Sequence, residues 1–247
     1  MTLSGQQCER YARNLLLSEV GEKGQQTLLS SRVLIVGAGG LGSPVALYLA
    51  AAGIGTLGIV DGDCVDITNL QRQVLHDTAD IGTPKVDSAK QSLAAINPDI
   101  DIETYNAMLT RENAVDIVSN YQFVIDATDN FESKQLIATA CHQTRTAYSH
   151  AGILGFIGQT MTVIPRETAC YRCLFRDEPP PQDGPAGVMG VVPGVIGTIQ
   201  ATEAVKYLLK IGNLLTDCLL VYDALKMRFR KIALRQDARC PLCGTAE

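Results

Sequence analysis

A glycine-rich segment early in the chain has the residue types and spacing of a phosphate-binding turn. Its glycines, in the pattern G-x-G-x-x-G with one glycine added, are Gly37, Gly39, Gly40 and Gly42. The apolar run 33–36 before them predicts a buried strand, and the apolar run 46–52 after them predicts a helix. Backbone amides at the start of such a helix can closely approach an anion. The segment therefore predicts a nucleotide phosphate site, with a turn whose glycines serve packing alone as the alternative.

Charged side chains follow the next predicted strand, TLGIVD at 56–61. Asp61 follows the glycines at close to the roughly 20-residue spacing at which a carboxylate binds ribose hydroxyls, and a turn or cap role is its alternative. Arg72 in TNLQRQ and Lys85 in the loop TPK bring two cations to the same region. This is more positive charge than a dinucleotide needs, and it suits a triphosphate in which one bond breaks.

A second pair of acids follows the strand predicted within FVIDATDN at 123–130. Asp126 and Asp129 fall at its carboxyl end, where open α/β sheets bind their ligands. A carboxylate here suits Mg²⁺, a hard cation that prefers oxygen ligands and bridges to phosphates. We expect Asp129 to hold the metal, whereas a role for Asp126 in closing the strand is left open.

Two C-x-x-C pairs, formed by Cys170, Cys173, Cys240 and Cys243, predict a metal site. Four thiolates make a closed tetrahedral Zn²⁺ site with no open position for catalysis, so its role is structural. A thioredoxin-like redox pair is the alternative for either half. The cysteines at 8, 64, 141 and 218 are expected to be small buried hydrophobes, with Cys64 close to the nucleotide edge.

The elements needed to position these residues form an α/β fold, a Rossmann-like mostly parallel sheet with helices on both faces. We divide the single domain into a helical leader (1–31), a nucleotide-binding core (32–165) and a loop, helix and zinc-pinned C-terminal extension (166–247). The predicted strands are 33–36, 56–61, 100–105, 123–130, 145–151, 159–164, 218–223 and 227–234, the last two as an antiparallel hairpin. The predicted helices after the leader are 46–52, 86–95, 111–119, 131–142 and 195–210. The proline-rich segment 170–190 is expected to be a long loop of poor order.

Composition excludes some classes of function. The 247 residues carry a net charge of −5, and clustered Lys and Arg are lacking, which argues against nucleic acid as a partner. The sequence has neither a signal-peptide pattern nor an 18-residue apolar segment, so it predicts no membrane contact and a cytoplasmic location. In that compartment the cysteines favour metal binding over disulfides.

Several motifs together resemble the bacterial members of the ubiquitin-activating-enzyme superfamily. These are the adenylyltransferases of the ThiF, MoeB and HesA type, which activate the sulfur-carrier proteins of thiamine and molybdopterin synthesis. The resemblance covers about residues 8–244. It is carried by RYAR at 10–13, GAGGLG at 37–42, DGD at 61–63, NLQRQ at 69–73, the lysine of TPK, DATDN at 126–130 and the paired C-x-x-C motifs.

The resemblance implies ATP-dependent adenylylation of the C-terminal glycine of a ubiquitin-like carrier ending in Gly-Gly. A persulfide donor such as a cysteine desulfurase then converts the acyl-adenylate to a thiocarboxylate. The residues implied in nucleotide or magnesium binding are Gly37, Gly39, Gly40, Gly42, Asp61, Asp63, Asn69, Gln71, Arg72, Lys85, Asp129 and Asn130. Arg13 is implied to act in the active site of a neighbouring subunit, which implies a homodimer.

One position departs from the family pattern. Relatives have a cysteine three residues before the A-G-V of the proline-rich segment, where this chain has Asp183. We therefore expect adenylylation without a loop thiol, and release of the adenylate to a separate donor.

Two other functions remain as alternatives. The glycines with Asp61 are compatible with an NAD-dependent oxidoreductase, although the cations and second acidic cluster oppose it. The three histidines of this chain, at 76, 142 and 150, are expected to serve surface or packing roles rather than hydride transfer. A non-catalytic scaffold with a carrier-binding groove is the second alternative.

Overall fold

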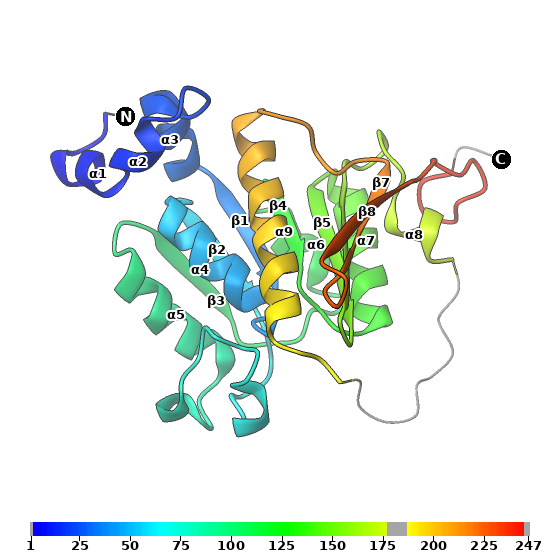
Figure 1. Cartoon of the computed structure of the whole chain (residues 1–247), viewed down its shortest axis with the longest axis horizontal. Helices are drawn as coiled ribbons and strands as arrows, with labels where there is room; N and C mark the ends of the chain where they lie inside the picture. The colour runs from blue at the N-terminus through cyan, green and yellow to red at the C-terminus, as the bar shows by residue number, and fades with distance from the viewer. Residues whose placement is uncertain (1, 177–186, 245–247) are drawn as a thin grey trace.

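The computed structural model describes residues 2–176 and 187–244. Its centre is an eight-stranded sheet in the order β3-β2-β1-β4-β5-β6-β7-β8 (Figure 1). The strands are β1 Arg32–Val36, β2 Thr56–Val60, β3 Asp101–Tyr105, β4 Phe123–Asp126, β5 Ala147–Leu154, β6 Ile157–Val163, β7 Cys218–Asp223 and β8 Arg228–Ala233. Strands β1 to β5 are parallel, and β6, β7 and β8 each pair antiparallel with their neighbours. The predicted mostly parallel sheet with an antiparallel C-terminal extension is confirmed.

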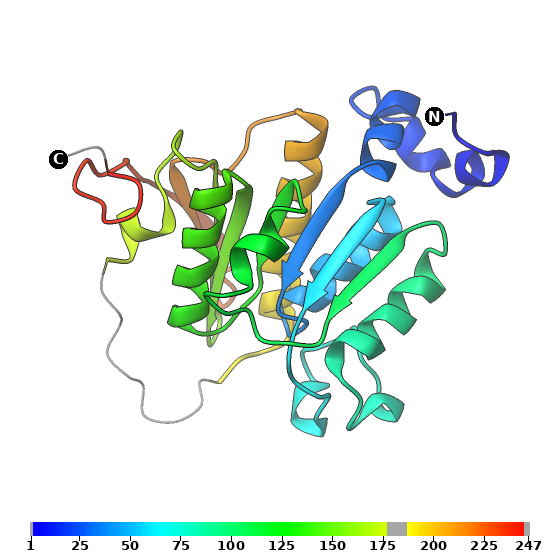
Figure 2. The ribbon, with the colours of Figure 1, turned by 180° about the vertical axis from the view of Figure 1, so that it is seen from behind.

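Helices cover both faces of the sheet (Figures 1 and 2). One face carries α3 Gly21–Leu29, α4 Gly42–Ala52, α5 Lys85–Ile96 and α9 Val191–Leu209, and the other carries α6 Ala114–Val118 and α7 Phe131–Thr144. Alternate residues of β1 enter the two hydrophobic cores: Val33 and Ile35 pack toward α4 and α9, and Leu34 and Val36 toward α6 and α7. Because both faces are covered, Val33 to Val36 of this strand are all apolar rather than alternating with polar residues.

The leader forms α1 Gly5–Arg10, α2 Ala12–Leu15 and α3. Figures 1 and 2 show these helices at the end of the sheet where β1 begins, which is opposite to the end where the glycine turn follows β1. Tyr11, 1% exposed, joins the leader to the core because its hydroxyl accepts a hydrogen bond from Asn97 Nδ2 at 2.8 Å. Two short 3-10 helices, Ile67–Asn69 and Thr78–Asp80, lie between β2 and α5.

Several predicted boundaries were wrong. Helix α9 begins at Val191 rather than 195, because Pro193 falls in its first turn, where a missing amide is tolerated. A short helix, α8 Tyr171–Leu174, stands within a segment predicted to lack helix, ahead of the prolines. Strand β4 ends at Asp126, so 127–130 is a loop. The expected poor order of the proline-rich segment falls largely on 177–186, outside the described residues.

The four solitary cysteines do not share one environment. Cys141 is buried as expected, and Cys218 is half-buried. Cys8 and Cys64 are exposed, so the prediction of buried hydrophobes was wrong for them. Across the described residues, every helix is too short or too polar to cross a lipid bilayer.

Candidate nucleotide site and metal centre

The glycine turn follows β1 and joins it to α4. Gly37 adopts φ +99°, and a Cβ there would lie 2.8 Å from the Ala127 carbonyl oxygen. A Cβ on Gly42 would lie 1.9 Å from the Gly37 oxygen. Packing therefore requires glycine at both positions. At Gly39 the nearest atom to an added Cβ is Gln73 Nε2 at 3.7 Å, so packing does not require glycine there.

Asp61 faces the glycine turn from the end of β2. Its Oδ2 accepts from the Ala38 amide at 2.8 Å, and its Oδ1 accepts from the Asp63 amide at 2.9 Å. Its side chain is 9% exposed. The turn role considered as an alternative for this aspartate is therefore present in the structure, and the carboxylate also lies directly against the turn.

Lys85 is the first residue of α5 rather than part of the preceding loop, and it is buried. Its Nζ lies 2.8 Å from Asp63 Oδ2 and 3.9 Å from Asp61 Oδ1. The Lys85 amide also donates to the Asp63 carbonyl at 2.9 Å. The structure thus brings the predicted lysine and both predicted aspartates together at the carboxyl end of β2.

The NLQRQ segment lies between the glycine turn and the start of α9. An added Cβ on Gly40 would meet Arg72 Cγ at 3.4 Å, and one on Gly190 would meet the Gln71 carbonyl at 2.4 Å. Arg72 donates from Nη1 to the Thr68 carbonyl at 3.0 Å. Asn69 ends the adjacent 3-10 helix, and its side chain accepts from the Asp66 amide.

Asp129 and Asn130 are exposed in the loop after β4. Asn130 caps α7, because its Oδ1 accepts from the Ser133 amide at 2.8 Å. The same loop carries Ala127, whose carbonyl packs against Gly37. Because β1, β2 and β4 are neighbouring parallel strands, their carboxyl ends lie together. Asp129 and Asn130 therefore lie at the same carboxyl edge of the sheet as the glycine turn and Lys85.

The structure does not bring Arg13 to this edge within one chain. Arg13 is exposed on α2, in the leader, at the opposite end of the sheet (Figures 1 and 2). Arg10, the other arginine of RYAR, does not reach this edge either. It is exposed and donates from Nη1 to the Ile96 carbonyl at 3.0 Å, at the end of α5.

Sequence reasoning missed a buried ionic cluster beneath the edge. Asp126 accepts from Lys134 Nζ at 3.2 Å and from His150 Nδ1 at 2.8 Å. Burial would raise the pKa of the Asp126 carboxyl, but Lys134 and His150 hold that pKa well below its usual value. Burial lowers the pKa of His150. Lys134 lies within the predicted helix 131–142, and nothing in the sequence around it indicated that its side chain would be buried.

His76 is also more closely tied to the site than the expected packing role suggested. It is buried, its Nε2 lies 3.0 Å from the Ala38 carbonyl oxygen, and its Nδ1 lies 2.7 Å from Ser88 Oγ. Burial lowers the pKa of His76. The neutral imidazole thus supports the glycine turn through its hydrogen bond to the Ala38 carbonyl.

The four predicted metal ligands meet at one point. Their sulfur atoms all lie within 4.8 Å of one another, with Cys170–Cys240 at 3.5 Å and Cys173–Cys243 at 3.3 Å. A tetrahedral zinc with bonds of about 2.3 Å places its sulfurs about 3.8 Å apart. The Asp237 amide faces Cys173 Sγ at 3.5 Å, as expected of second-sphere support for a thiolate. The donor set fits a structural Zn²⁺ and leaves no fifth protein ligand among the described residues.

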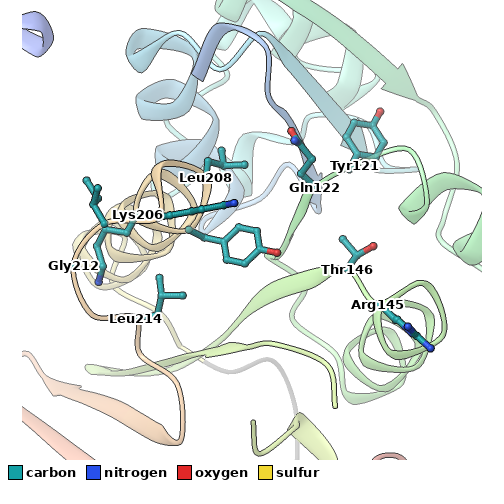
Figure 3. Close-up of a pocket in the computed structure, with 11 residues that line it drawn as sticks. Tyr121, Gln122, Arg145, Thr146, Lys206, Leu208, Gly212 and Leu214 are labelled. Carbon is teal, nitrogen blue, oxygen red and sulfur yellow. The ribbon is translucent and has the colours of Figure 1, made fainter. Parts of the chain in front are cut away.

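A cavity of about 510 Å³ lies away from this edge (Figure 3). Its lining includes Tyr121, Gln122 and Thr146, which flank the amino ends of β4 and β5, and Lys206 of α9. Arg145 and Lys210 occupy the left-handed C-caps of α7 and α9, where cations complement the helix dipoles. These cations are explained by helix ends, so the cavity is no rival to the candidate site.

The sequence matches the ThiF family over residues 11–242. It is 44% identical over 248 residues to the SAMP-activating enzyme E1 of Haloferax volcanii, covering 99% of this chain and 92% of that protein. It is also 44% identical over 253 residues to the sulfur carrier protein adenylyltransferase of Thermus thermophilus, covering 99% and 93%.

The fold is similar to that of E. coli MccB crystallised with ATP, with a TM-score of 0.85, 23% identity, and coverage of 95% of this chain and 73% of that one. At this identity the likeness concerns the fold. The family match spans residues 11–242, which include the glycine turn, the acidic loops and three of the four clustered cysteines, and the chain therefore belongs to the ThiF family.

Proposed function

We propose that this protein uses ATP to adenylylate the C-terminal glycine of a small ubiquitin-like sulfur-carrier protein. A carboxylate oxygen of the carrier attacks the α-phosphorus, the bond to the β-phosphate oxygen breaks, and pyrophosphate leaves with the electron pair. The observation that carries the proposal is the meeting of Lys85, Arg72 and Asp129 with the glycine turn at one sheet edge. The names of the two relatives at 44% identity point to the same reaction.

The chain's part in this reaction is positioning and charge stabilisation, because in-line displacement at phosphorus needs no protein nucleophile. We assign the phosphates and ribose of ATP to the glycine turn and the residues that face it, which are Gly37, Gly39, Gly40, Gly42, Asp61, Asp63, Asn69, Gln71, Arg72 and Lys85. The open backbone at Gly39 supports this assignment, since packing alone does not explain a glycine there.

Asp129 is the proposed ligand of Mg²⁺, with Asn130 beside the nucleotide. The exposed carboxylate fits a hard cation that keeps several waters and bridges to phosphate oxygens. When bound, the metal neutralises charge on the departing pyrophosphate. Asn130 also caps α7, so the loop is anchored next to the proposed metal ligand.

Arg13 is proposed to act in the site of a second copy of the chain. Its place at the far end of the sheet supports this, because the arginine cannot join its own chain's edge without rearranging the leader. Each active site of the proposed homodimer would then combine one subunit's Lys85 and Asp129 with the partner's leader.

The proposed sulfur donor is a separate persulfide-bearing protein such as a cysteine desulfurase, and the proposed location is the cytoplasm. The sequence has no cysteine between Cys173 and Cys218, so no thiol of that segment is available to hold the carrier. Asp183 itself lies outside the described residues. Intact-mass measurement of the purified enzyme with carrier and ATP tests this point, and a reducible enzyme–carrier conjugate would refute it.

Carrier-dependent exchange of labelled pyrophosphate into ATP tests the function. Thiamine-type and molybdopterin-type carriers ending in Gly-Gly are assayed separately, with carriers lacking the final glycine as controls. We expect exchange with at least one intact carrier and none with its truncated form. Carrier binding without exchange would favour the scaffold, and binding of NAD in place of ATP would favour the oxidoreductase.

A further inference from the structure

A buried ion pair lies directly beneath the loop that carries Asp129. Asp126 is 1% exposed and Lys134 is 9% exposed. The Lys134 Nζ lies 3.2 and 3.3 Å from the two carboxylate oxygens of Asp126. The proposed reaction uses neither side chain, so the pair needs another explanation.

Lys134 joins three segments of the chain. Besides Asp126 at the end of β4, its Nζ donates to the Thr128 carbonyl at 2.6 Å and to the Ala151 carbonyl of β5 at 2.7 Å. An ammonium group has three donors, and these partners use all of them. A neutral side chain of the same length could not replace these bonds.

The loop is held at Thr128 from two sides. Lys134 binds its carbonyl, and Asp126 Oδ1 accepts from its amide at 3.1 Å and from its hydroxyl at 2.7 Å. On the other side of Asp129, Asn130 is held by the Ser133 amide. Asp129 is therefore an exposed residue between two fixed neighbours.

The arrangement favours a geometric role over a stabilising one. A buried ion pair is often no more stabilising than apolar residues of the same volume, because both charges lose their hydration. The gain here is a defined position for the loop, whose Ala127 carbonyl also packs against Gly37 of the glycine turn. The pair thus fixes Asp129 relative to the turn.

We propose that Lys134 is a positioning residue for adenylylation, which holds Asp129 where it can bind the magnesium of Mg·ATP. The inference rests on the proposed function, because it takes Asp129 as the metal ligand. Lys134 touches neither substrate nor metal, and acts through the loop.

The test compares the Mg²⁺ dependence of pyrophosphate exchange in Lys134→Met and in the wild type. We expect the Mg²⁺ concentration at half-maximal rate to rise about tenfold, as for other residues that orient a metal ligand, and Lys134→Arg to restore most of the loss. The control is Lys206→Met, which breaks the pair of Lys206 with buried Glu203 beside the cavity of Figure 3. It should lower the melting temperature and leave the Mg²⁺ dependence unchanged.

An unchanged Mg²⁺ dependence in a folded Lys134→Met enzyme would overturn the inference. If that variant does not fold, Asp126→Asn with Lys134→Met removes both charges and leaves no buried charge unpaired. We expect the same raised Mg²⁺ requirement, and a wild-type value would again overturn the inference. A wild-type enzyme without exchange on any carrier would contradict the proposed function instead. Calorimetric binding of Mg·ATP then decides the role of Lys134, with the same shift expected.

Discussion

Lys85 Nζ lies 2.8 Å from Asp63 Oδ2 at the edge where the glycine turn follows β1. The buried ammonium is thus held by a carboxylate, and Asp61 Oδ1 lies 3.9 Å from the same Nζ. For Lys85 to contact a phosphate of ATP, it must exchange at least part of this contact. The aspartates restrain the Lys85 ammonium at this edge, which reduces the conformational entropy that the side chain loses when the nucleotide binds.

Lys85→Ala should lower kcat/KM for pyrophosphate exchange by about 10²- to 10³-fold, because it removes one charged donor from the developing pyrophosphate. Steady-state exchange with varied ATP measures the loss. Lys90→Ala is the matched control, since Lys90 is an exposed lysine on the same helix. Equal losses in both variants would remove Lys85 from the mechanism.

Asp129→Ala should nearly abolish exchange and leave the zinc content unchanged, because it removes the proposed magnesium ligand without touching the thiolate cluster. Exchange and metal analysis are measured on the same preparation. Glu132→Ala, which changes an exposed acid in the first turn of α7, should keep its activity. An Asp129→Ala enzyme as active as the wild type would contradict the assignment.

Arg13→Ala and Asp129→Ala enzymes should each be inactive alone and regain activity when their subunits are mixed. In a mixed dimer, one site has both intact residues, so random exchange of subunits gives about a quarter of the wild-type activity. Arg10→Ala, which loses the bond to the Ile96 carbonyl, should stay active without mixing. If the mixture stays inactive although mixed dimers form, Arg13 does not act across subunits.

Cys173→Ser should release the metal and lower the melting temperature by roughly 5–10 °C, since binding of zinc by thiolates contributes directly to folding. Metal analysis and a thermal melt with and without chelator measure both effects. Cys8→Ser, at an exposed cysteine outside the cluster, should change neither. A Cys173→Ser protein that retains its full zinc content would contradict the four-thiolate site.

Stability should fall as the pH drops from 7.5 to 5.5. Burial lowers the pKa of His76 and of His150 in the folded state, so below about pH 6.5 the unfolded chain binds more protons and is favoured. Each histidine contributes up to about 1.4 kcal/mol per pH unit. Urea unfolding at both pH values measures the slope, and His76→Gln should flatten it. An equal slope in that variant would contradict the neutral buried form.

The Asp126 carboxyl contributes to the stability of the folded state in a different pH range. Burial opposes ionisation of this carboxyl, but Lys134 and His150 lower its pKa to about 2. The folded state is therefore favoured above about pH 3.8, and this contribution is lost as the pH falls from there toward 2. Asp126→Asn should remove the loss of stability in that range and leave the contribution of His76 between pH 7.5 and 5.5 in place, because His150, but not His76, is hydrogen-bonded to Asp126.

Sequence patterns predicted the sheet well because the central strands β1, β2 and β4 are short, mostly apolar runs bounded by turn residues, and β3 alternates apolar and polar residues. All eight predicted strands are present, and Lys85, Asp61 and the glycines meet because parallel neighbours end at the same edge. The cysteine pairs converge for a different reason, since their ligand spacing already specified a shared metal.

Long-range pairing of single polar residues could not be predicted. In the sequence Lys134 has the pattern of a solvated helix residue, and only the fold brings it to the Ala151 carbonyl of β5. His76 likewise has the pattern of a loop residue, and only the fold brings it to the Ala38 carbonyl. Helix α9 begins earlier than predicted because Pro193 lies in its first turn, where a residue without a backbone N–H is tolerated.

The cysteine cluster joins positions 170 and 240, so a bound metal closes a ring of about 70 residues that contains α9, β7 and β8. Strands β7 and β8 cannot separate from the sheet unless the ring changes shape or the metal dissociates. A single backbone cut inside the ring would leave two fragments tethered through sulfur. They would migrate as one species on a native gel until a chelator and denaturant released them.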